Sequence, residues 1–287
     1  MVKKLISMLV AFVVILVVLF GALCAGLYFN QNSMVFVPSR EMVMTPDEVN
    51  MRYEDIYIEV APGENINAWY IPANDSSAPT VLFCHGNTGN ISHRIYSAQF
   101  LNGLGANLLL FDCRGYGMSD GAPSEENAYA DAAAAYNWLV NEKGINPSNL
   151  FIFGRSLGGA LVVELALHVE CAGVIVESSF TSAHDMGQRM FPYLPTKLLS
   201  RYRFDSISKV GRLSCPILVT HSPDDDLIPY EMGRSLYNRA AEPKTFIDLS
   251  GRHNERLYFD SDVYINGLRG FLGFGAGISE QGIRDWH

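Results

Sequence analysis

A serine within a short glycine-flanked motif is the side chain of this sequence best suited to chemistry. The segment Gly154-Arg155-Ser156-Leu157-Gly158 has the pattern Gly-x-Ser-x-Gly, with an apolar run before it and an Ala/Leu/Val-rich run after it. That order predicts a strand, a tight turn and a helix, with the serine hydroxyl exposed on a strained turn. The N-terminus of the following helix carries unpaired N–H groups and a partial positive charge, which would stabilise an oxyanion. Ser156 is therefore the candidate nucleophile.

A serine hydroxyl needs a base, and the base needs a carboxylate that orients it. In an α/β-hydrolase these partners follow the serine in the order Asp or Glu, then His. Two later turns supply them: Asp224-Asp225-Asp226 follows the apolar run 216–220, and His253 follows the run 244–249. His221 precedes the acidic cluster and so breaks the order. His253 is the candidate base, and the residue chemistry leaves all three aspartates open as its partner.

Two backbone N–H groups are candidates for an oxyanion hole. One belongs to the residue after the nucleophile, Leu157, and the other to the loop after the third strand. That loop is His85-Gly86-Asn87-Thr88-Gly89-Asn90, in which Asn87 supplies the N–H and His85 has a structural role. The sequence contains no Walker loop, no dinucleotide fingerprint and no metal-ligand cluster, so we expect neither a cofactor nor a metal.

Alternating strand and helix patterns must position these residues. The first two strands form a hairpin through 62–65, and from residue 80 onward strands alternate with helices, which predicts βαβ units. The expected fold is α/β: an α/β-hydrolase fold with a mostly parallel eight-stranded sheet and helices on both faces. The predicted strands are 55–60, 66–71, 80–84, 107–111, 150–153, 173–176, 216–220 and 244–249, and the predicted helices are 92–104, 124–142, 157–168, 231–241 and 261–272.

The interval 178–214 has no predicted strand and is rich in aromatic and apolar residues. At roughly forty residues it exceeds an ordinary connection, so we expect a small helical cap over the site, with a plain one-helix connection as the alternative. The tail, 273–287, is glycine-rich and expected to be loosely ordered.

The first thirty residues differ from the rest. Lys3 and Lys4 precede an uncharged apolar run, 5–29, which can span a bilayer of roughly 30 Å. The run is longer than the apolar region of a signal peptide, which favours an uncleaved anchor (residues 1–30) over a cleaved signal. The positive-inside rule then leaves the N-terminus in the cytoplasm and the catalytic domain, 31–272, outside it, in a periplasm, a lumen or the extracellular space.

Composition sets outer limits on the function. A chain of 287 residues with 48% hydrophobic residues suffices for one α/β domain and a short extra element. The net charge of −9 argues against nucleic acid as a partner. Cys84 and Cys113 end runs that could be neighbouring strands, so a disulfide between them stays open.

Several segments together resemble the membrane-anchored bud-emergence-type branch of the α/β-hydrolases, and more distantly serine hydrolases of the depalmitoylase and serine-aminopeptidase types. The resemblance runs from the anchor to about residue 272. Its Asp-x-x-Ile-Pro pattern implies that Asp225 is the acid of the triad. Cys113 and Arg252 depart from it, since Tyr and Gly are common at these places. The matching segments are 35–40, 68–72, 85–92, 114–117, 154–159, 225–229 and 253–255.

The leading hypothesis is a membrane-anchored serine hydrolase that cleaves carboxylic esters or thioesters through an acyl-enzyme on Ser156. The apolar cap beside the anchor hints at lipid-like substrates. An amide or peptide hydrolase of the serine-aminopeptidase type is the first alternative. The second is a membrane-tethered interaction protein that has kept the fold without using the chemistry.

Overall fold

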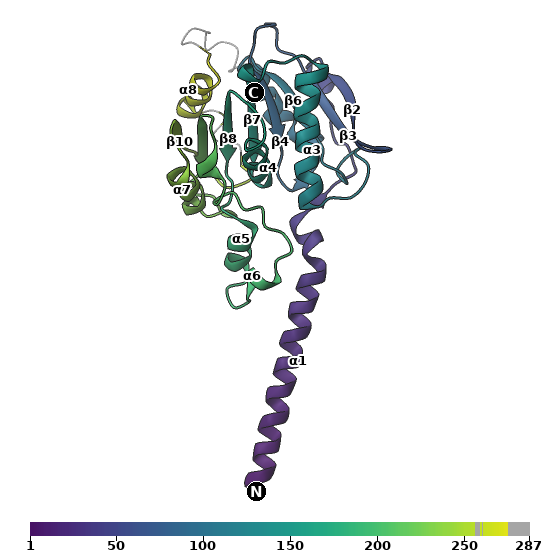
Figure 1. Ribbon diagram of the computed structural model, residues 1–287, viewed down its shortest axis with the longest axis vertical. Coiled ribbons are helices and arrows are strands. Elements are labelled where there is room, and N and C mark those ends of the chain that lie inside the picture. Colours follow the sequence, from purple (N-terminus) through teal and green to yellow (C-terminus); the bar gives the residue numbers. More distant parts are fainter. Residues whose placement is uncertain (256–258, 260, 275–287) are drawn as a thin grey trace.

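An eight-stranded sheet forms the centre of the molecule in a computed structural model that describes residues 1–255, 259 and 261–274 (Figure 1). Its order is β10-β9-β8-β7-β4-β6-β3-β2. Strands β6, β4, β7, β8, β9 and β10 pair in parallel, whereas β3 pairs antiparallel with both β2 and β6. The predicted α/β-hydrolase fold, including the N-terminal hairpin, is confirmed. The strands are β2 (Glu54–Ala61), β3 (Glu64–Ile71), β4 (Thr80–Cys84), β6 (Asn107–Phe111), β7 (Leu150–Arg155), β8 (Gly173–Glu177), β9 (Ile217–His221) and β10 (Lys244–Asp248).

Side chains of the central strands alternate between two buried faces. On β4, Leu82 and Cys84 belong to one core, and Val81 and Phe83 belong to the other. Because both faces are covered, these strands are apolar on both sides and read as continuous apolar runs in the sequence. The helices of the first face are α3 (Glu125–Asn137), α4 (Leu157–Leu165) and α7 (Tyr230–Arg239), and those of the second are α2 (Ile95–Gly103) and α8 (Asp262–Phe271).

Helix boundaries differ from the predicted ones by a few residues. The predicted helix 92–104 starts as a 3₁₀ turn, Ile91–Arg94, because the Asn90 side chain accepts a hydrogen bond from the Ser92 N–H and tightens the first turn. The predicted helix 124–142 is α3 followed by a π-helical turn, Trp138–Glu142. A two-residue parallel pair, β1 (Val37–Pro38) with β5 (Thr88–Gly89), has no counterpart in the predictions, since two residues carry no periodic signal.

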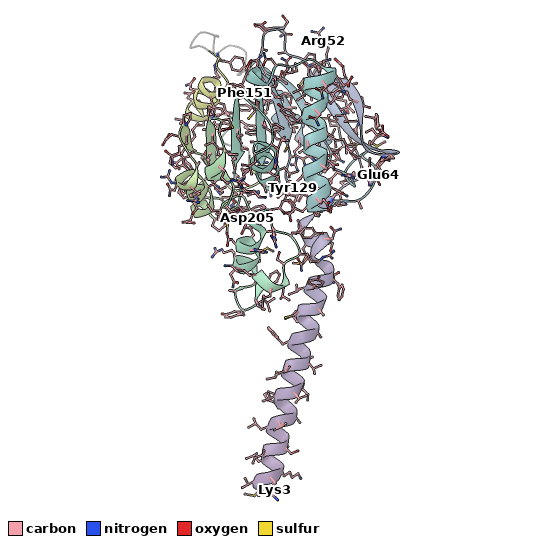
Figure 2. All side chains as sticks on the ribbon, in the orientation of Figure 1. Lys3, Arg52, Glu64, Tyr129, Phe151 and Asp205 are labelled. Atoms are coloured by element: carbon pink, nitrogen blue, oxygen red, sulfur yellow. The ribbon has the colours of Figure 1, made fainter. Side chains whose placement is uncertain are left out.

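Helix α1 (Val2–Val35) projects away from the domain, with Lys3 at its far end (Figures 1 and 2). It is long and apolar enough to cross a membrane, and its apolar 18-residue window is not buried by the rest of the chain. The helix continues beyond the predicted span, which ended at Phe29. The extra turns are held by hydrogen bonds between Gln31 and the interval 178–214: Gln31 Nε2 donates to Leu199 O at 2.7 Å, and Gln31 Oε1 accepts from Arg201 N at 2.7 Å.

The interval 178–214 contains two short helices, α5 (Ala183–Met190) and α6 (Thr196–Leu199). They project from the carboxyl edge of the sheet and lie alongside the upper part of α1 (Figure 1). This is the predicted small helical cap. The predicted loose tail lies outside the described residues from 275 onward.

The five cysteines are free thiols, including Cys84 and Cys113, for which a disulfide was an open possibility. The thiols that share a hydrogen bond are those of Cys171 and Cys215. Cys171 precedes β8 and Cys215 precedes β9, so the parallel pairing of these strands brings the two residues together.

The crossing of β7, β4 and α4 leaves no room for a side chain at Gly158. A Cβ there would lie 1.9 Å from the Cys84 carbonyl oxygen. We therefore expect Gly158→Ala to lower the free energy of unfolding by about 3 kcal/mol. The melting temperature, measured by circular dichroism, should fall by roughly 6–12 °C. Gly270→Ala is the matched control, because a Cβ at Gly270 meets nothing within 4 Å. Equal melting temperatures for the two variants would contradict this account of the close approach.

Candidate active site

The backbone of Ser156 is the sharpest feature of the site. This residue lies between β7 and α4 with φ 55° and ψ −119°, a left-handed region that non-glycine residues rarely occupy. Its N–H donates to Glu177 O at 2.9 Å, and its carbonyl accepts from Ser179 Oγ at 2.8 Å. These two bonds from the neighbouring strand hold a conformation that costs about 1–3 kcal/mol. The result is the strained strand–turn–helix geometry expected for the motif.

The glycines of the motif make this turn possible. A Cβ at Gly154 would lie 2.2 Å from Gly158 O, and one at Gly159 would lie 2.3 Å from Ser179 Oγ. The turn therefore closes only because glycines, which have no side chain, occupy these positions in β7 and in the first turn of α4.

The structure brings His253 and Asp225 to Ser156. His253 Nε2 lies 3.2 Å from Ser156 Oγ, and His253 Nδ1 lies 2.7 Å from Asp225 Oδ2. Asp225 stands in the turn after β9, and His253 in the turn after β10. The three side chains come from different crossovers but share one edge of the sheet, because parallel strands end on the same side.

The Asp225 carboxylate is buried and thoroughly hydrogen-bonded. Burial alone would raise its pKa, but hydrogen bonds from His221 and His253 hold the pKa of Asp225 well below its usual range. The Ile228 N–H also donates to Oδ1, at 2.8 Å. Asp225 thus stays ionised and keeps a negative charge on the Nδ1 side of His253, while Nε2 faces Ser156 Oγ.

The three aspartates of the cluster have separate positions. Asp224 is exposed, Asp225 reaches the His253 ring, and Asp226 Oδ1 lies 3.2 Å from the His253 backbone N–H. The geometry thus distinguishes residues that residue chemistry alone left equivalent. His221, which the chain-order argument set aside, is buried beside the acid: its Nε2 lies 3.4 Å from Asp225 Oδ2 and 2.9 Å from Ile228 O.

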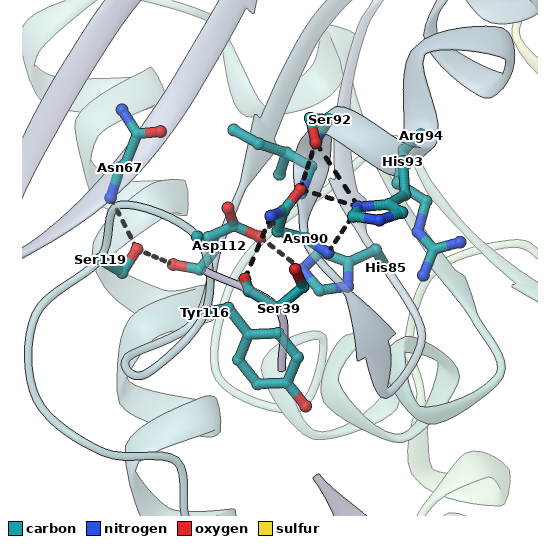
Figure 3. Close-up of polar contacts among 12 residues, drawn as sticks. Ser39, Asn67, His85, Asn90, Ser92, His93, Arg94, Asp112, Tyr116 and Ser119 are labelled. Atoms are coloured by element: carbon teal, nitrogen blue, oxygen red, sulfur yellow. Dashed lines mark hydrogen bonds and ion pairs between the residues drawn. The ribbon is translucent and has the colours of Figure 1, made fainter. Parts of the chain in front are cut away.

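The loop that holds Asn87 is fixed by buried polar contacts, drawn in part in Figure 3. His85 Nε2 lies 3.0 Å from Asp112 Oδ1, an oxygen that also accepts from the Ile91 N–H. The Asn87 carbonyl accepts from the Tyr116 hydroxyl at 2.8 Å and from the Val37 N–H at 2.9 Å. His85 therefore has the structural role that the sequence reasoning assigned to it.

Two N–H groups remain available beside the serine. Asn87 and Leu157 both line the same cavity as Ser156. Within the described part of the chain, no residue accepts a hydrogen bond from the Asn87 or Leu157 N–H. Unpaired N–H groups next to a reactive hydroxyl can bind an oxyanion.

The cavity holds about 250 Å³ and is almost entirely apolar. Its walls come from the end of α1, from the cap and from the turn after β9, with Phe180, Met186, Leu194 and Leu227 among them. No charged side chain occurs among the described residues that line it. In the same part of the chain, no group of three or more His, Cys, Asp or Glu residues could hold a metal ion.

A second charged group supports the histidine turn, and the sequence reasoning missed it. A guanidinium N–H of Arg155 donates to the His253 carbonyl oxygen, and Arg155 Nε lies 3.2 Å from Glu177 Oε1. The Tyr264 hydroxyl donates to Glu177 Oε2, and the Glu177 side chain is 2% exposed. One signal was present: a glutamate directly ends the apolar run 173–176, at the edge of the sheet that holds Ser156.

The hydrogen bond from Arg155 to the His253 carbonyl should position His253 beside Ser156, and we expect the variant Arg155→Met to test this role. Without the guanidinium, the His253 turn loses its tie to β7, and a displacement of about 1 Å typically costs about 10²-fold in rate. Ester turnover should show a lower kcat with little change in KM. Arg252→Met is the control, because Arg252 adjoins His253 but is exposed. Unchanged kcat in Arg155→Met would exclude the positioning role.

With this geometry established, comparison with known proteins places the chain in a family. Residues 79–205 match the model of the alpha/beta hydrolase fold family. The alpha/beta hydrolase domain-containing protein WAV2 of Arabidopsis thaliana is 32% identical over 82% of this chain and 84% of that protein. The lysophosphatidylserine lipase ABHD12 of Danio rerio is 32% identical over 68% of this chain and 55% of that protein.

Solved structures show the same fold. The esterase Pf2001 of Pyrococcus furiosus superposes with a TM-score of 0.68 at 21% identity, covering 82% of this chain and 98% of the esterase. The strand order and the strained serine turn both fit the α/β-hydrolase fold. The similarity to WAV2 over most of both chains points to the same family. The chain belongs to the α/β-hydrolase family.

Proposed function

We propose that this protein is a membrane-anchored serine hydrolase that cleaves carboxylic esters or thioesters through an acyl-enzyme on Ser156. The observation that carries the proposal is the continuous contact from Asp225 through His253 to Ser156, with N···O distances of 2.7 and 3.2 Å. A serine in a strained turn beside a histidine that is oriented by a buried carboxylate is the arrangement that acyl transfer requires.

In the proposed reaction, Ser156 Oγ attacks the carbonyl carbon while His253 Nε2 takes the hydroxyl proton. The Asn87 and Leu157 N–H groups receive the oxyanion. The carbon–oxygen or carbon–sulfur bond to the leaving group then breaks, and His253 returns the proton to the departing alcohol or thiol. A water molecule, deprotonated by His253, attacks the acyl-enzyme and releases the carboxylic acid. Asp225 stays ionised throughout and stabilises the imidazolium.

The cavity favours an ester or thioester over a peptide. Its described lining contains no charged side chain that would hold the ammonium group of a peptide N-terminus. An apolar pocket of this kind fits a neutral acyl group instead. The lipase name of the zebrafish relative supports the same substrate class. We also propose, from the segments that carry the resemblance, that the chain belongs to the bud-emergence-type branch.

The catalytic assignments predict a graded loss of activity. Ser156→Ala should abolish labelling by a fluorophosphonate probe, because the attacking oxygen is gone. Asp225→Asn should lower kcat for a p-nitrophenyl ester by about 10⁴-fold, because the histidine loses the carboxylate that sets its tautomer. Asp224→Asn, at an exposed neighbour, should retain full activity. Labelling of Ser156→Ala at the wild-type rate would refute the assignment, and faster turnover of aminoacyl anilides than of esters would favour the peptidase alternative.

We also propose that the hydrolase domain lies outside the cytoplasm, on the basis of Lys3 and Lys4 before the span. A protease added to intact cells or spheroplasts should then digest the domain without permeabilisation. A domain that is digested only after permeabilisation would place it on the cytoplasmic side.

A further inference from the structure

The anchoring helix contributes to the cavity beside Ser156. Leu27, Gln31, Met34 and Val35 of α1 line the same cavity as Ser156 and Asn87. Their spacing of three and four residues places these side chains on one face of the helix. A helix that served only as a tether would not need a face that continues the wall of the active site.

This helical wall is fastened at both of its edges. On the cap side, Tyr202 Oη lies 2.8 Å from Asn32 Oδ1, in addition to the two bonds of Gln31. On the side of the nucleophile, Asn87 Nδ2 donates to the Val35 carbonyl at 3.0 Å. The last turns of α1 are therefore held between the cap and the oxyanion loop.

The position of the membrane along α1 places the Leu27 end of this cavity near the lipid surface. About 20 helical residues cross the roughly 30 Å hydrocarbon core. With Lys3 and Lys4 at one boundary, the core ends near Cys24, and Leu27 lies just beyond it. Leu27 is about 12 Å along the helix from Val35, at 1.5 Å per residue. The cavity thus runs from Ser156 toward the headgroup layer.

The cap carries the surface expected at that depth. It lies beside α1 on the side of the domain from which α1 projects (Figure 1), and it exposes Met190, Tyr193 and Leu198, with Tyr193 94% exposed. Residues 183–203 contain four basic side chains and a single acidic one, Asp185, although the whole chain has a net charge of −9. Apolar side chains flanked by basic ones suit the interface of an anionic bilayer.

We propose that α1 forms one wall of the acyl-binding pocket, so that the enzyme takes the acyl chain of a lipid ester directly from the bilayer surface. This inference rests on the proposed esterase function. The chain lies between α1 and the cap, with its carbonyl at Ser156 and its far end near Leu27. The anchor therefore helps to set the acyl chain length that the enzyme accepts.

A chain-length series on the full-length protein in mixed micelles tests this wall. Leu27→Trp fills the distal end of the cavity, so kcat/KM for a p-nitrophenyl dodecanoyl ester should fall at least about 10-fold through lost apolar burial. The value for the acetyl ester should fall far less than the dodecanoyl value, because the short chain ends near Ser156. Leu27→Ala, which cannot overpack the pocket, should shift the optimum toward longer chains. Phe29→Trp is the matched control, since Phe29 is on the same helix and 74% exposed.

The outcomes separate this inference from the proposed function. If neither Leu27 variant changes the chain-length profile while fluorophosphonate labelling is normal, α1 is not a pocket wall and the esterase proposal stands. The same holds if Phe29→Trp causes an equal loss, or if Leu27→Trp slows acetyl and dodecanoyl esters alike. If the wild-type protein neither labels nor cleaves any ester, the proposed function itself fails.

Discussion

The strained backbone of Ser156 is the constraint on which the rest of the site depends. A positive φ at a residue with a Cβ persists only where the surroundings over-determine it. Here the Glu177 carbonyl and the Ser179 hydroxyl hold the residue from β8, while glycines at 154, 158 and 159 let α4 fold back against β7. The serine is thereby lifted above the sheet edge, where groups from β9 and β10 can reach it.

Buried polar contacts hold the loops that surround this serine. Asp112 Oδ1 contacts His85 Nε2 and accepts a hydrogen bond from the Ile91 N–H. The Tyr116 hydroxyl donates a hydrogen bond to the Asn87 carbonyl. Each contact satisfies groups that would be costly to bury alone. The loop positions around Ser156 therefore follow from internal hydrogen bonding. Buried polar contacts also hold the turn of His253. Arg155, at the end of β7, pairs with Glu177 and donates a hydrogen bond to the His253 carbonyl.

Helix α1 and the hydrolase domain form a connected unit. Strand β1 follows α1 directly and pairs with β5 in the loop of Asn87, whose carbonyl accepts a hydrogen bond from the Val37 N–H. The cap meets the other side of the helix through Gln31 and Asn32. The helix therefore contacts both the cap and the loop of Asn87, and all three line the cavity beside Ser156.

The sequence by itself predicted the sheet and singled out Ser156 and His253 as the candidate nucleophile and base. Strands buried on both faces read as unbroken apolar runs, the serine motif has a fixed strand–turn–helix context, and chain order separates His253 from His221. The sequence could not choose among Asp224, Asp225 and Asp226 by chemistry, since adjacent residues of one turn differ only in where their side chains point. It also missed Arg155 with Glu177 and the pocket face of α1, whose partners lie on remote segments. Only the tertiary structure decided these points, because contacts between such segments depend on how the strands are ordered and how α1 packs, which no local pattern encodes.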